Sequence, residues 1–437
     1  MIHTYTLFGR HIIIDTASGA VHEADAATLA LLSTITPPMQ KEPPPALCEQ
    51  DKEIWAELYG LYEDGMLFSD ETRVALPTET PLKAICLHVA HDCNLRCRYC
   101  FAETGSFGAQ RGLMNKETAE RAVDFLLSRC GGRKNLEIDF FGGEPLLALD
   151  TVKHTVNYAR TAAPDKRFRF TITTNGIALD DDSISFINAE MDNVVLSLDG
   201  RADVNDRARP RPNGKGSYDA IVPRYKQLVE SRAGDYFIRG TYTTDNLDFY
   251  EDILHMAKLG FENISVEPVV LTPGHKLALT QECLPELFGE YEKLTAELEK
   301  GEFSFFHFNI DLEQGPCLYK RLRGCGAGYE YAAIAPDGEV YPCHQFVGKP
   351  EYKMGDVFAG GFDEKISASF SGRSIYMTQE CASCWVKYYC SGGCAAGNLT
   401  VNGDMDKPDE LTCALERKRL ECAIYLKIVE KSGFEAE

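Results

Sequence analysis

The sequence lacks the features of a membrane or secreted protein. No stretch approaches the roughly eighteen consecutive apolar residues that a transmembrane helix requires. The opening residues, MIHTYTLFGRHIII, contain no basic segment followed by an apolar run and a small-residue cleavage site. We therefore expect a cytoplasmic protein that does not act at a membrane.

Basic residues are also scarce. The chain has 45 Lys and Arg against 66 Asp and Glu, so its formal net charge is −21. Nucleic-acid binding requires a basic surface that can neutralise phosphates, and anionic membranes attract basic surfaces in the same way. The charge therefore argues against nucleic acid as a partner and disfavours anionic membranes.

Cysteine, in contrast, is abundant. A chain of 437 residues is long enough for two or three domains, and it contains 16 cysteines. A reducing compartment keeps thiols unpaired, which makes disulfides the weaker interpretation. Clustered cysteines in such a compartment more often bind metal.

Residues 1–75 are predicted to form a small domain of their own. The runs TYTLFG, HIIIDT and AVHEA indicate short strands, and two helices are expected at Ala26–Ile35 and Glu53–Leu67. This order suggests a winged-helix-like domain, a shape that often binds DNA. Residues 1–80 carry 4 Lys and Arg against 13 Asp and Glu, however, which makes DNA binding improbable.

Residues 84–300 alternate strand and helix six times. Amphipathic helices, including Lys116–Arg129, Val152–Ala163, Tyr218–Ser231 and Phe249–Leu259, separate the strands. The expected strands are ICLHVA, LEIDFFGG, FRFTITTNG, NVVLSLDG, YFIRGTYTT and NISVEPVV. Repeated βα units predict a parallel sheet with helices outside, and six units favour a partial (β/α)6 TIM-like barrel. The chemistry of such barrels lies where strands end.

A cysteine motif follows the first barrel strand. Cys93, Cys97 and Cys100 have the spacing C-x₃-C-x₂-C, so their thiolates can hold three irons of a cubane cluster and leave the fourth iron open. An open iron suits chelation by the amino and carboxylate groups of a small molecule. A zinc site is the alternative, with His88 or His91 as the fourth ligand.

Polar residues also mark the ends of the next strands. Gly143 and Glu144 can meet an ammonium group, short polar groups suit ribose hydroxyls, and Arg239 can pair with a carboxylate. The candidate ligand-binding residues are Gly142, Gly143, Glu144, Thr173, Asn175, Ser197, Asp199 and Arg239. Each signal is weak alone, but their order along one barrel is specific.

With these motifs the chain resembles the radical S-adenosylmethionine (SAM) superfamily. The resemblance implies that Cys93, Cys97 and Cys100 form the catalytic site and bind a 4Fe–4S cluster. It also implies that Tyr99 lies beside the adenine and that Glu144 meets the methionine amine, together with Gly143. An electron from the cluster would cleave the sulfur–C5′ bond of SAM and release a 5′-deoxyadenosyl radical.

Residues 301–437 are predicted to form a bridging region and a Cys-rich domain. Residues 315–415 are rich in Gly and Cys with few long periodic segments, and a final helix is expected at Ala414–Lys431. Seven cysteine spacings resemble the SPASM pattern found in peptide-modifying radical enzymes. The resemblance assigns one auxiliary 4Fe–4S cluster to Cys381, Cys384, Cys390 and Cys413, and another to Cys325, Cys343 and Cys394. Either Cys317 or a substrate thiol completes the latter. The other cysteines (Cys48, Cys86, Cys130, Cys283 and Cys422) are expected to be small, buried apolar residues.

Further motifs identify a narrower group. The opening MIH-x-Y-x₃-G, NDRARPRPNGKGSYD, YPCHQFVG and YYCSGGCAAGN resemble the thioether-forming maturases of SCIFF peptides, within the ranthipeptide and sactipeptide class. The resemblance implies a Cys-rich precursor peptide whose leader adds as a strand to the edge of the N-terminal sheet. It implies an intramolecular thioether as product and an electron donor such as ferredoxin or flavodoxin.

Two alternatives remain. A sulfatase-maturase-like radical SAM oxidase shares the barrel and the SPASM domain, but it has no obvious need for the N-terminal domain. A non-enzymatic zinc or iron–sulfur protein that binds a peptide is the other, and it leaves the GGEP, TTNG and SLDG strand ends without a role.

Overall fold

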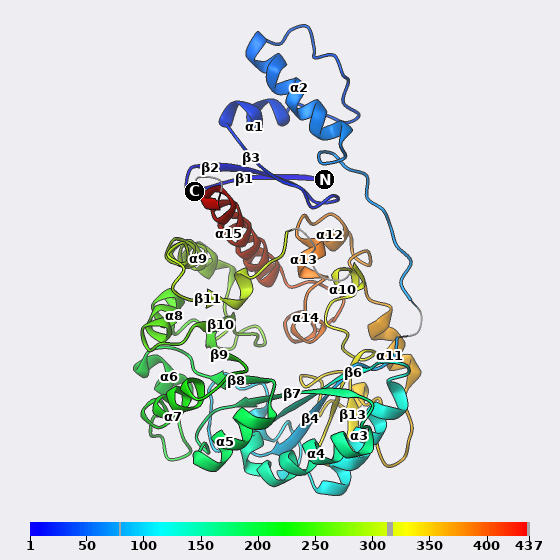
Figure 1. Ribbon diagram of the computed structural model, residues 1–437, viewed down its shortest axis with the longest axis vertical. Coiled ribbons are helices and arrows are strands. Elements are labelled where there is room, and N and C mark those ends of the chain that lie inside the picture. The colour runs from blue at the N-terminus through cyan, green and yellow to red at the C-terminus, as the bar shows by residue number, and fades with distance from the viewer. Residues whose placement is uncertain (78–79, 313–317, 435–437) are drawn as a thin grey trace.

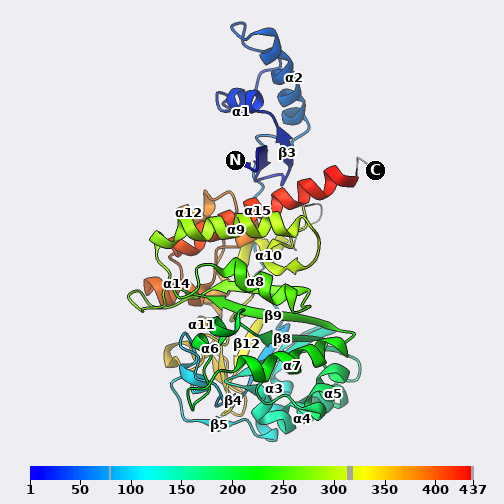
Figure 2. The same ribbon diagram turned by 90° about the vertical axis from the view of Figure 1, so that its left-hand side faces the viewer.

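The computed structural model describes residues 1–77, 80–312 and 318–434. The barrel lies at one end of an elongated molecule and the N-terminal module (residues 1–75) at the other, with much of the C-terminal region between them (Figures 1 and 2). No helix of the described residues is long and apolar enough to cross a membrane.

The N-terminal module begins with a three-stranded antiparallel sheet. Its strands are β1 (Ile2–Leu7), β2 (Arg10–Asp15) and β3 (Val21–Ala24), in the order β1-β2-β3. Helices α1 (Ala26–Leu32) and α2 (Glu49–Glu63) follow, and they pack with Ile13 and Leu67 in a separate apolar core.

Helix α2 begins about one turn before its predicted position. Cys48 caps the helix, because its Sγ accepts a hydrogen bond from Asp51 N at 3.5 Å. The helix ends at Glu63, and Gly65 follows with a φ of +68°, a conformation that favours glycine. The sequence prediction of Glu53–Leu67 missed this cap because Cys is not a common N-cap residue.

The barrel is an open parallel sheet, as the sequence predicts. The strands lie in the order β4-β6-β7-β8-β9-β10, and all adjacent pairs are parallel. They are β4 (Ala84–His91), β6 (Asn135–Gly142), β7 (Arg167–Thr174), β8 (Asn193–Ser197), β9 (Asp235–Tyr242) and β10 (Asn263–Pro268). This confirms the α/β partial-barrel fold.

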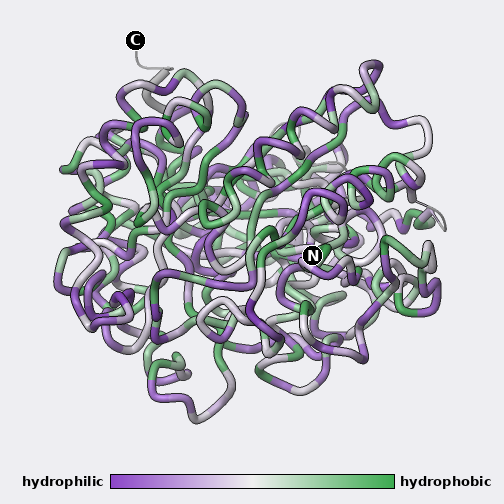
Figure 3. Tube along the Cα trace, turned by 90° about the horizontal axis from the view of Figure 1, so that it is seen from below, coloured by the Kyte–Doolittle hydropathy of each residue, from purple (hydrophilic) through white to green (hydrophobic). Residues whose placement is uncertain are grey.

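Helices cover the outer face of the sheet (Figure 1). They are α3 (Lys116–Arg129), α4 (Leu149–Ala162), α5 (Asp181–Glu190), α6 (Ala202–Ala208), α7 (Tyr218–Glu230) and α8 (Phe249–Lys258). Alternate strand residues, such as Leu136, Ile138 and Phe140, belong to the buried core. Hydrophobic and hydrophilic residues accordingly alternate along much of the trace (Figure 3).

The same sheet continues into the C-terminal region, which the sequence did not predict. Strand β12 (Tyr331–Ile334) pairs in parallel with β4, while β13 (Glu339–Tyr341) and β14 (Gly355–Asp356) add antiparallel strands. Two-residue strands β5 (Gly112–Leu113) and β11 (Ser304–Phe305) pair with β4 and β10. Strands this short show no readable periodicity. The pairing places the region after Cys325 beside the strand that precedes Cys93.

The remaining helices build the C-terminal region. Helix α15 (Glu410–Phe434) packs against both α9 (Leu284–Leu298) and β1, so it joins the barrel to the N-terminal module. It extends beyond the predicted Ala414–Lys431, with Asp409 accepting hydrogen bonds from Leu411 N and Thr412 N at its start. The others are α10 (Leu318–Arg323), α11 (Glu364–Ser371), α12 (Gln379–Ala382), α13 (Lys387–Cys390) and α14 (Ala395–Asn402).

Candidate functional site

The first three cysteines lie on the loop that follows β4. Backbone hydrogen bonds tie this loop to the segment after α6: Arg96 N donates to Pro210 O at 2.7 Å, and Arg98 N donates to Ala208 O at 2.9 Å. Leu95 is 1% exposed, so a buried apolar side chain anchors the loop. The loop is therefore fixed at the carboxyl end of the sheet.

The thiols of this loop face one another. The pKa of Cys93 is raised to about 11 and that of Cys97 to about 12, in both cases mainly by burial, with a smaller contribution from the neighbouring Cys100. Cys93 Sγ also accepts hydrogen bonds from Leu95 N at 3.4 Å and Asn175 Nδ2 at 3.5 Å. A cationic iron cluster would hold such thiolates deprotonated, and the N–H donors suit ligand sulfurs, so these residues fit the cluster.

The zinc alternative finds no support in the geometry. His88 and His91 are buried, with ring centroids 4.5 and 4.9 Å from that of Phe107. Within the described part of the chain, no three His, Cys, Asp or Glu side chains are placed to hold a single ion. A cubane differs in this respect, since each thiolate binds its own iron.

Two glycines allow the end of β6 to pack against the cysteine loop. Gly143 N donates to Ala90 O at 2.8 Å, and Glu144 N donates to Asp92 O at 2.9 Å. A Cβ on Gly143 would lie 2.2 Å from Asp92 O, and one on Gly142 would lie 2.3 Å from Ala90 O. The pair of glycines is therefore required for the approach of two backbones, whatever ligand they also meet.

We expect Gly143→Ala to lower the SAM-binding affinity at least about tenfold and the iron content by up to about a third, because the methyl group would displace the backbone beside Cys93. Iron analysis and equilibrium binding measure the effect. Gly132→Ala is the matched control, since no atom lies within 4 Å of its added Cβ. Wild-type iron and affinity in Gly143→Ala would show that the loop does not depend on this contact.

Three hydrogen-bond donors orient the buried carboxyl group of Glu144. Its oxygens accept hydrogen bonds from Thr174 Oγ1 at 2.7 Å, Asn175 N at 2.8 Å and Leu146 N at 3.1 Å. Burial raises its pKa to about 7 in spite of these bonds. An ammonium group bound beside it would favour the ionised form.

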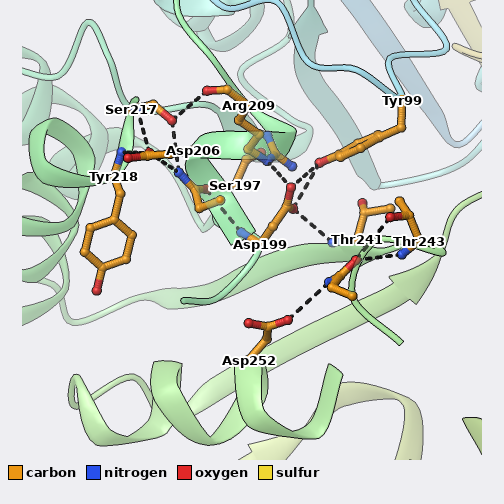
Figure 4. A network of polar contacts seen from close by, with 12 residues as sticks. Tyr99, Ser197, Asp199, Asp206, Arg209, Ser217, Tyr218, Thr241, Thr243 and Asp252 are labelled. Atoms are coloured by element: carbon orange, nitrogen blue, oxygen red, sulfur yellow. Dashed lines mark hydrogen bonds and ion pairs between the residues drawn. The ribbon is translucent and has the colours of Figure 1, made fainter. Parts of the chain in front are cut away.

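Tyr99 belongs to a polar network beneath the cysteine loop (Figure 4). Its hydroxyl donates to the Asp199 carboxylate, 3.0 and 2.7 Å from the two oxygens. Asp199 is fully buried, accepts a hydrogen bond from Thr241 N at 3.0 Å and forms an ion pair with Arg209 Nε at 3.0 Å. Asp199 thus holds Tyr99, the residue between Cys97 and Cys100, and its ribose contact stays a prediction.

Sequence reasoning missed the role of Arg209 and its neighbours. Arg209 pairs with Asp199, and its guanidinium carbon lies 5.6 Å from the centroid of the Tyr99 ring. Ser217 Oγ donates to Arg209 O at 2.8 Å, while Asp206 Oδ1 accepts from Ser217 N at 2.8 Å (Figure 4). The polar run NDRARPRPNGKGSYD could have indicated this network in the sequence, because so many polar residues around a turn between two helices require hydrogen-bond partners.

The other candidate residues are less constrained. Thr173 and Ser197 are half-buried at the ends of β7 and β8, and Asn175 Nδ2 also donates to Asn94 Oδ1 at 2.8 Å. Arg239 is 51% exposed and pairs with Glu267 at 2.7 Å. Thr173, Ser197 and Asn175 remain predicted ribose contacts, and Arg239, which pairs with Glu267 through one nitrogen, remains a predicted partner of a ligand carboxylate.

Four thiols gather near the start of α15. The pKa of Cys390 is raised by burial, then by Glu416, and also by Cys413, Cys381 and Cys384. Burial raises the pKa of Cys413 to about 11, and the Cys381 and Cys384 thiols contribute. The four residues that the SPASM pattern groups together are therefore neighbours, and their number fits a fully ligated 4Fe–4S cluster.

A second group lies beside the extended sheet. Burial raises the pKa of Cys343 to about 12, and the Cys394 and Cys325 thiols raise it further. Cys325 and Cys394 are exposed. Cys317, the candidate fourth ligand, lies outside the described residues.

Comparisons with known families agree with this arrangement. Residues 87–232 match the radical SAM superfamily, and residues 325–385 match the iron–sulfur cluster-binding domain called SPASM. These segments contain the cysteine loop after β4 and Cys325, Cys343, Cys381 and Cys384. The chain therefore carries a radical SAM domain followed by a SPASM domain, which confirms the resemblance to both.

Individual relatives extend the likeness. The chain is 24% identical to a serine-type anaerobic sulfatase-maturating enzyme of Klebsiella aerogenes, over 71% of this chain and 80% of the relative. It is 26% identical to a mycofactocin maturase of Mycolicibacterium smegmatis, over 74% of this chain and 81% of the relative.

Two solved structures share the fold. The chain of anSMEcpe, bound to AdoMet and the Cp18Cys peptide, matches with a TM-score of 0.65 and 18% identity, covering 80% of this chain and 100% of its own length. Streptococcus suis SuiB, bound to its precursor peptide SuiA, matches with a TM-score of 0.56 and 17% identity, covering 94% of this chain and 98% of its own.

Proposed function

We propose that this protein is a radical SAM peptide maturase with three 4Fe–4S clusters. The observation that carries the proposal is that its thiols form three separate groups, within each of which the thiols are neighbours. One group lies at the barrel mouth and two lie in the C-terminal region. Cys93, Cys97 and Cys100 bind the catalytic cluster in this proposal. Each of the other groups binds an auxiliary cluster.

The bound cofactors would supply a 5′-deoxyadenosyl radical, which can take hydrogen from unactivated carbon. The residues of the barrel position that chemistry. Glu144 receives the methionine ammonium, and the Asp199 carboxylate holds Tyr99 in place beside the adenine. Asn175 and Ser197 contact the ribose from the ends of adjacent strands.

The substrate in this proposal is a peptide bound through its leader to the N-terminal module. The likeness to SuiB supports it, because a match over 94% of this chain must include most of that module. Strand β3 offers a free edge: no strand pairs with its outer side in the described residues. Asp15 N donates to Ala20 O, so these two residues form a hydrogen-bonded pair of the β2–β3 hairpin. Hydrogen-bonded and non-hydrogen-bonded pairs alternate along an antiparallel ladder. The backbone N–H and C=O groups of Val21 and Glu23 therefore point away from β2, toward the free edge.

The product in this proposal is an intramolecular thioether in a Cys-rich precursor. One hydrogen would leave the acceptor carbon for the deoxyadenosyl radical, the cysteine sulfur would bond to that carbon, and the thiol proton would go to solvent. A cluster held by the C-terminal cysteines would accept the one surplus electron. The exposed Cys325 and Cys394 make their site accessible to a substrate thiol. Ferredoxin or flavodoxin is the proposed source of the electron that starts the reaction.

Oxidation of a protein side chain, as in sulfatase maturation, is the second candidate. The relative from Klebsiella aerogenes and the fold of anSMEcpe favour it. The match to anSMEcpe covers all of that chain but 80% of this one, so this protein has more chain than that fold requires. The N-terminal module accounts for such an excess and favours leader-dependent peptide modification.

Two measurements test the proposal. The anaerobically reconstituted protein should contain about twelve iron and twelve sulfide per chain, as expected for three four-iron clusters. A Cys-rich precursor should lose two hydrogens and one alkylatable thiol per modification in mass spectrometry. Exchange of two hydrogens and the cysteine sulfur for one oxygen, as in formylglycine formation, with no cross-link between fragments, would instead establish the oxidase.

Glu23→Pro is expected to weaken leader binding at least about tenfold, because proline removes an outward N–H from the β3 edge. The β2–β3 pairing would remain intact. Titration with a labelled leader peptide gives the affinity, and Glu23→Gln controls for the lost charge and for the ion pair with Arg10. Equal affinity in Glu23→Pro and Glu23→Gln would exclude strand addition at β3.

A further inference from the structure

The linker that follows α2, at the end of the N-terminal module, contacts the segment between two proposed cluster ligands. Glu71 lies in this linker, which runs from α2 past α12 and α13 (Figure 1). Its carboxylate accepts hydrogen bonds from Lys387 Nζ at 2.7 Å and Tyr388 Oη at 2.8 Å. Both partners lie between Cys384 and Cys390.

Lys387 is an unusual lysine because its side chain is only 3% exposed. Its ammonium group also donates to Ala382 O at 2.9 Å, on the turn between Cys381 and Cys384. A buried ammonium requires a counter-charge, since an unpaired buried charge is strongly unfavourable. Glu71 supplies that charge from a part of the chain more than three hundred residues away in sequence.

The N-terminal sheet contacts the same segment from another side. The ring of Trp385, next to Cys384, stacks on His3 of β1 with centroids 3.9 Å apart and planes 7° apart. His3 Nε2 lies 3.1 Å from Glu421 Oε1, and Tyr5 Oη donates to Glu421 O at 2.8 Å. Glu421 belongs to α15, the helix that carries Cys413. The N-terminal region thus contacts both elements that present this group of thiols.

We infer that Glu71 is a positioning residue for the auxiliary cluster of Cys381, Cys384, Cys390 and Cys413. The inference rests on the proposed function, which assigns a cluster to these thiols. Through Lys387 and Tyr388, Glu71 fixes the backbone that presents Cys384 and Cys390. Docking of the N-terminal region therefore sets the geometry and the reduction potential of this cluster.

The inference is tested in protein that also carries alanine at Cys93, Cys97 and Cys100, so that the catalytic cluster does not contribute. Glu71→Gln should shift the midpoint potential and the paramagnetic resonance spectrum of this cluster, or release its iron. Glu63→Gln is the matched control: Glu63 Oε1 likewise accepts a tyrosine hydroxyl, from Tyr59 at 3.1 Å, but on the exposed surface of α2.

A double variant separates charge pairing from general damage. Glu71→Gln with Lys387→Met removes both charges, so its potential should lie closer to wild type than that of Glu71→Gln alone. Should Glu71→Gln fail to fold, Tyr388→Phe removes one hydrogen bond to the same carboxylate and keeps the ring, and it should shift the potential in the same direction.

Unchanged iron content, potential and spectrum in Glu71→Gln, or in Tyr388→Phe where that variant is used, would overturn the inference. Wild-type protein with about twelve iron atoms would leave the proposed function standing in that case. Wild-type protein without auxiliary clusters would overturn the proposed function itself, so the two failures are distinguishable.

Discussion

Replacement of Cys93, Cys97 and Cys100 together by alanine is expected to abolish SAM cleavage and to leave the C-terminal clusters in place. The three thiols are neighbours on one loop, and their removal leaves the catalytic iron without protein ligands. Iron per chain should fall by about a third if, as proposed, one of three four-iron clusters is lost. Chromatography of deoxyadenosine from the reduced enzyme measures the activity.

The separation of the sites makes this result interpretable. The other two groups of thiols lie on α12 to α15 and beside β13. The thiols named as raising the pKa values of Cys390 and Cys343 do not include those of the loop after β4. Cys130→Ala, Cys283→Ala and Cys422→Ala together provide the control, because they also remove three thiols but from buried positions outside the groups. Deoxyadenosine formation by the catalytic-loop variant would show that the catalytic assignment is wrong.

The barrel could be predicted from the sequence because its strands are long and its helices amphipathic. The six strand runs, from ICLHVA to NISVEPVV, each contain alternating or continuous apolar residues, and the structure places them in chain order. Strands β12 to β14 have only two to four residues, and β12, which joins them to the barrel sheet, pairs with the distant β4. Their position depends on tertiary contacts that no local pattern encodes.

The candidate site likewise has one part that could be predicted from the sequence and another that could not. Cysteine spacing along a short loop is a local property, so the grouping of Cys93, Cys97 and Cys100 can be inferred from sequence. The ion pair of Glu71 with Lys387 joins residues more than three hundred positions apart, and that of Arg209 with Asp199 forms only when the segment after α6 folds back on the end of β8. An isolated charged residue is usually a solvated surface residue, and the burial of Asp199, Arg209 and Lys387 is what distinguishes these pairs.

The group of Cys325, Cys343 and Cys394 leads to the second large effect, on the choice of substrate. A precursor whose donor cysteine is changed to serine should still bind through its leader but should gain no cross-link. A substrate thiolate can complete an open iron site, whereas a serine hydroxyl is a far poorer ligand for such iron at neutral pH. Mass spectrometry of the product and titration of the leader measure the two effects separately.

Spectroscopy and one enzyme variant decide whether the site is open. Paramagnetic resonance of the reduced auxiliary cluster should change on addition of native precursor and stay unchanged with the serine version. Full activity of Cys317→Ala would then agree with an open iron at the site of Cys325, Cys343 and Cys394. Loss of that cluster in Cys317→Ala, with no spectral response of the wild-type enzyme to native peptide, would make Cys317 the fourth ligand. The substrate thiol would then reach the acceptor carbon without a bond to iron, and leader binding alone would have to position it.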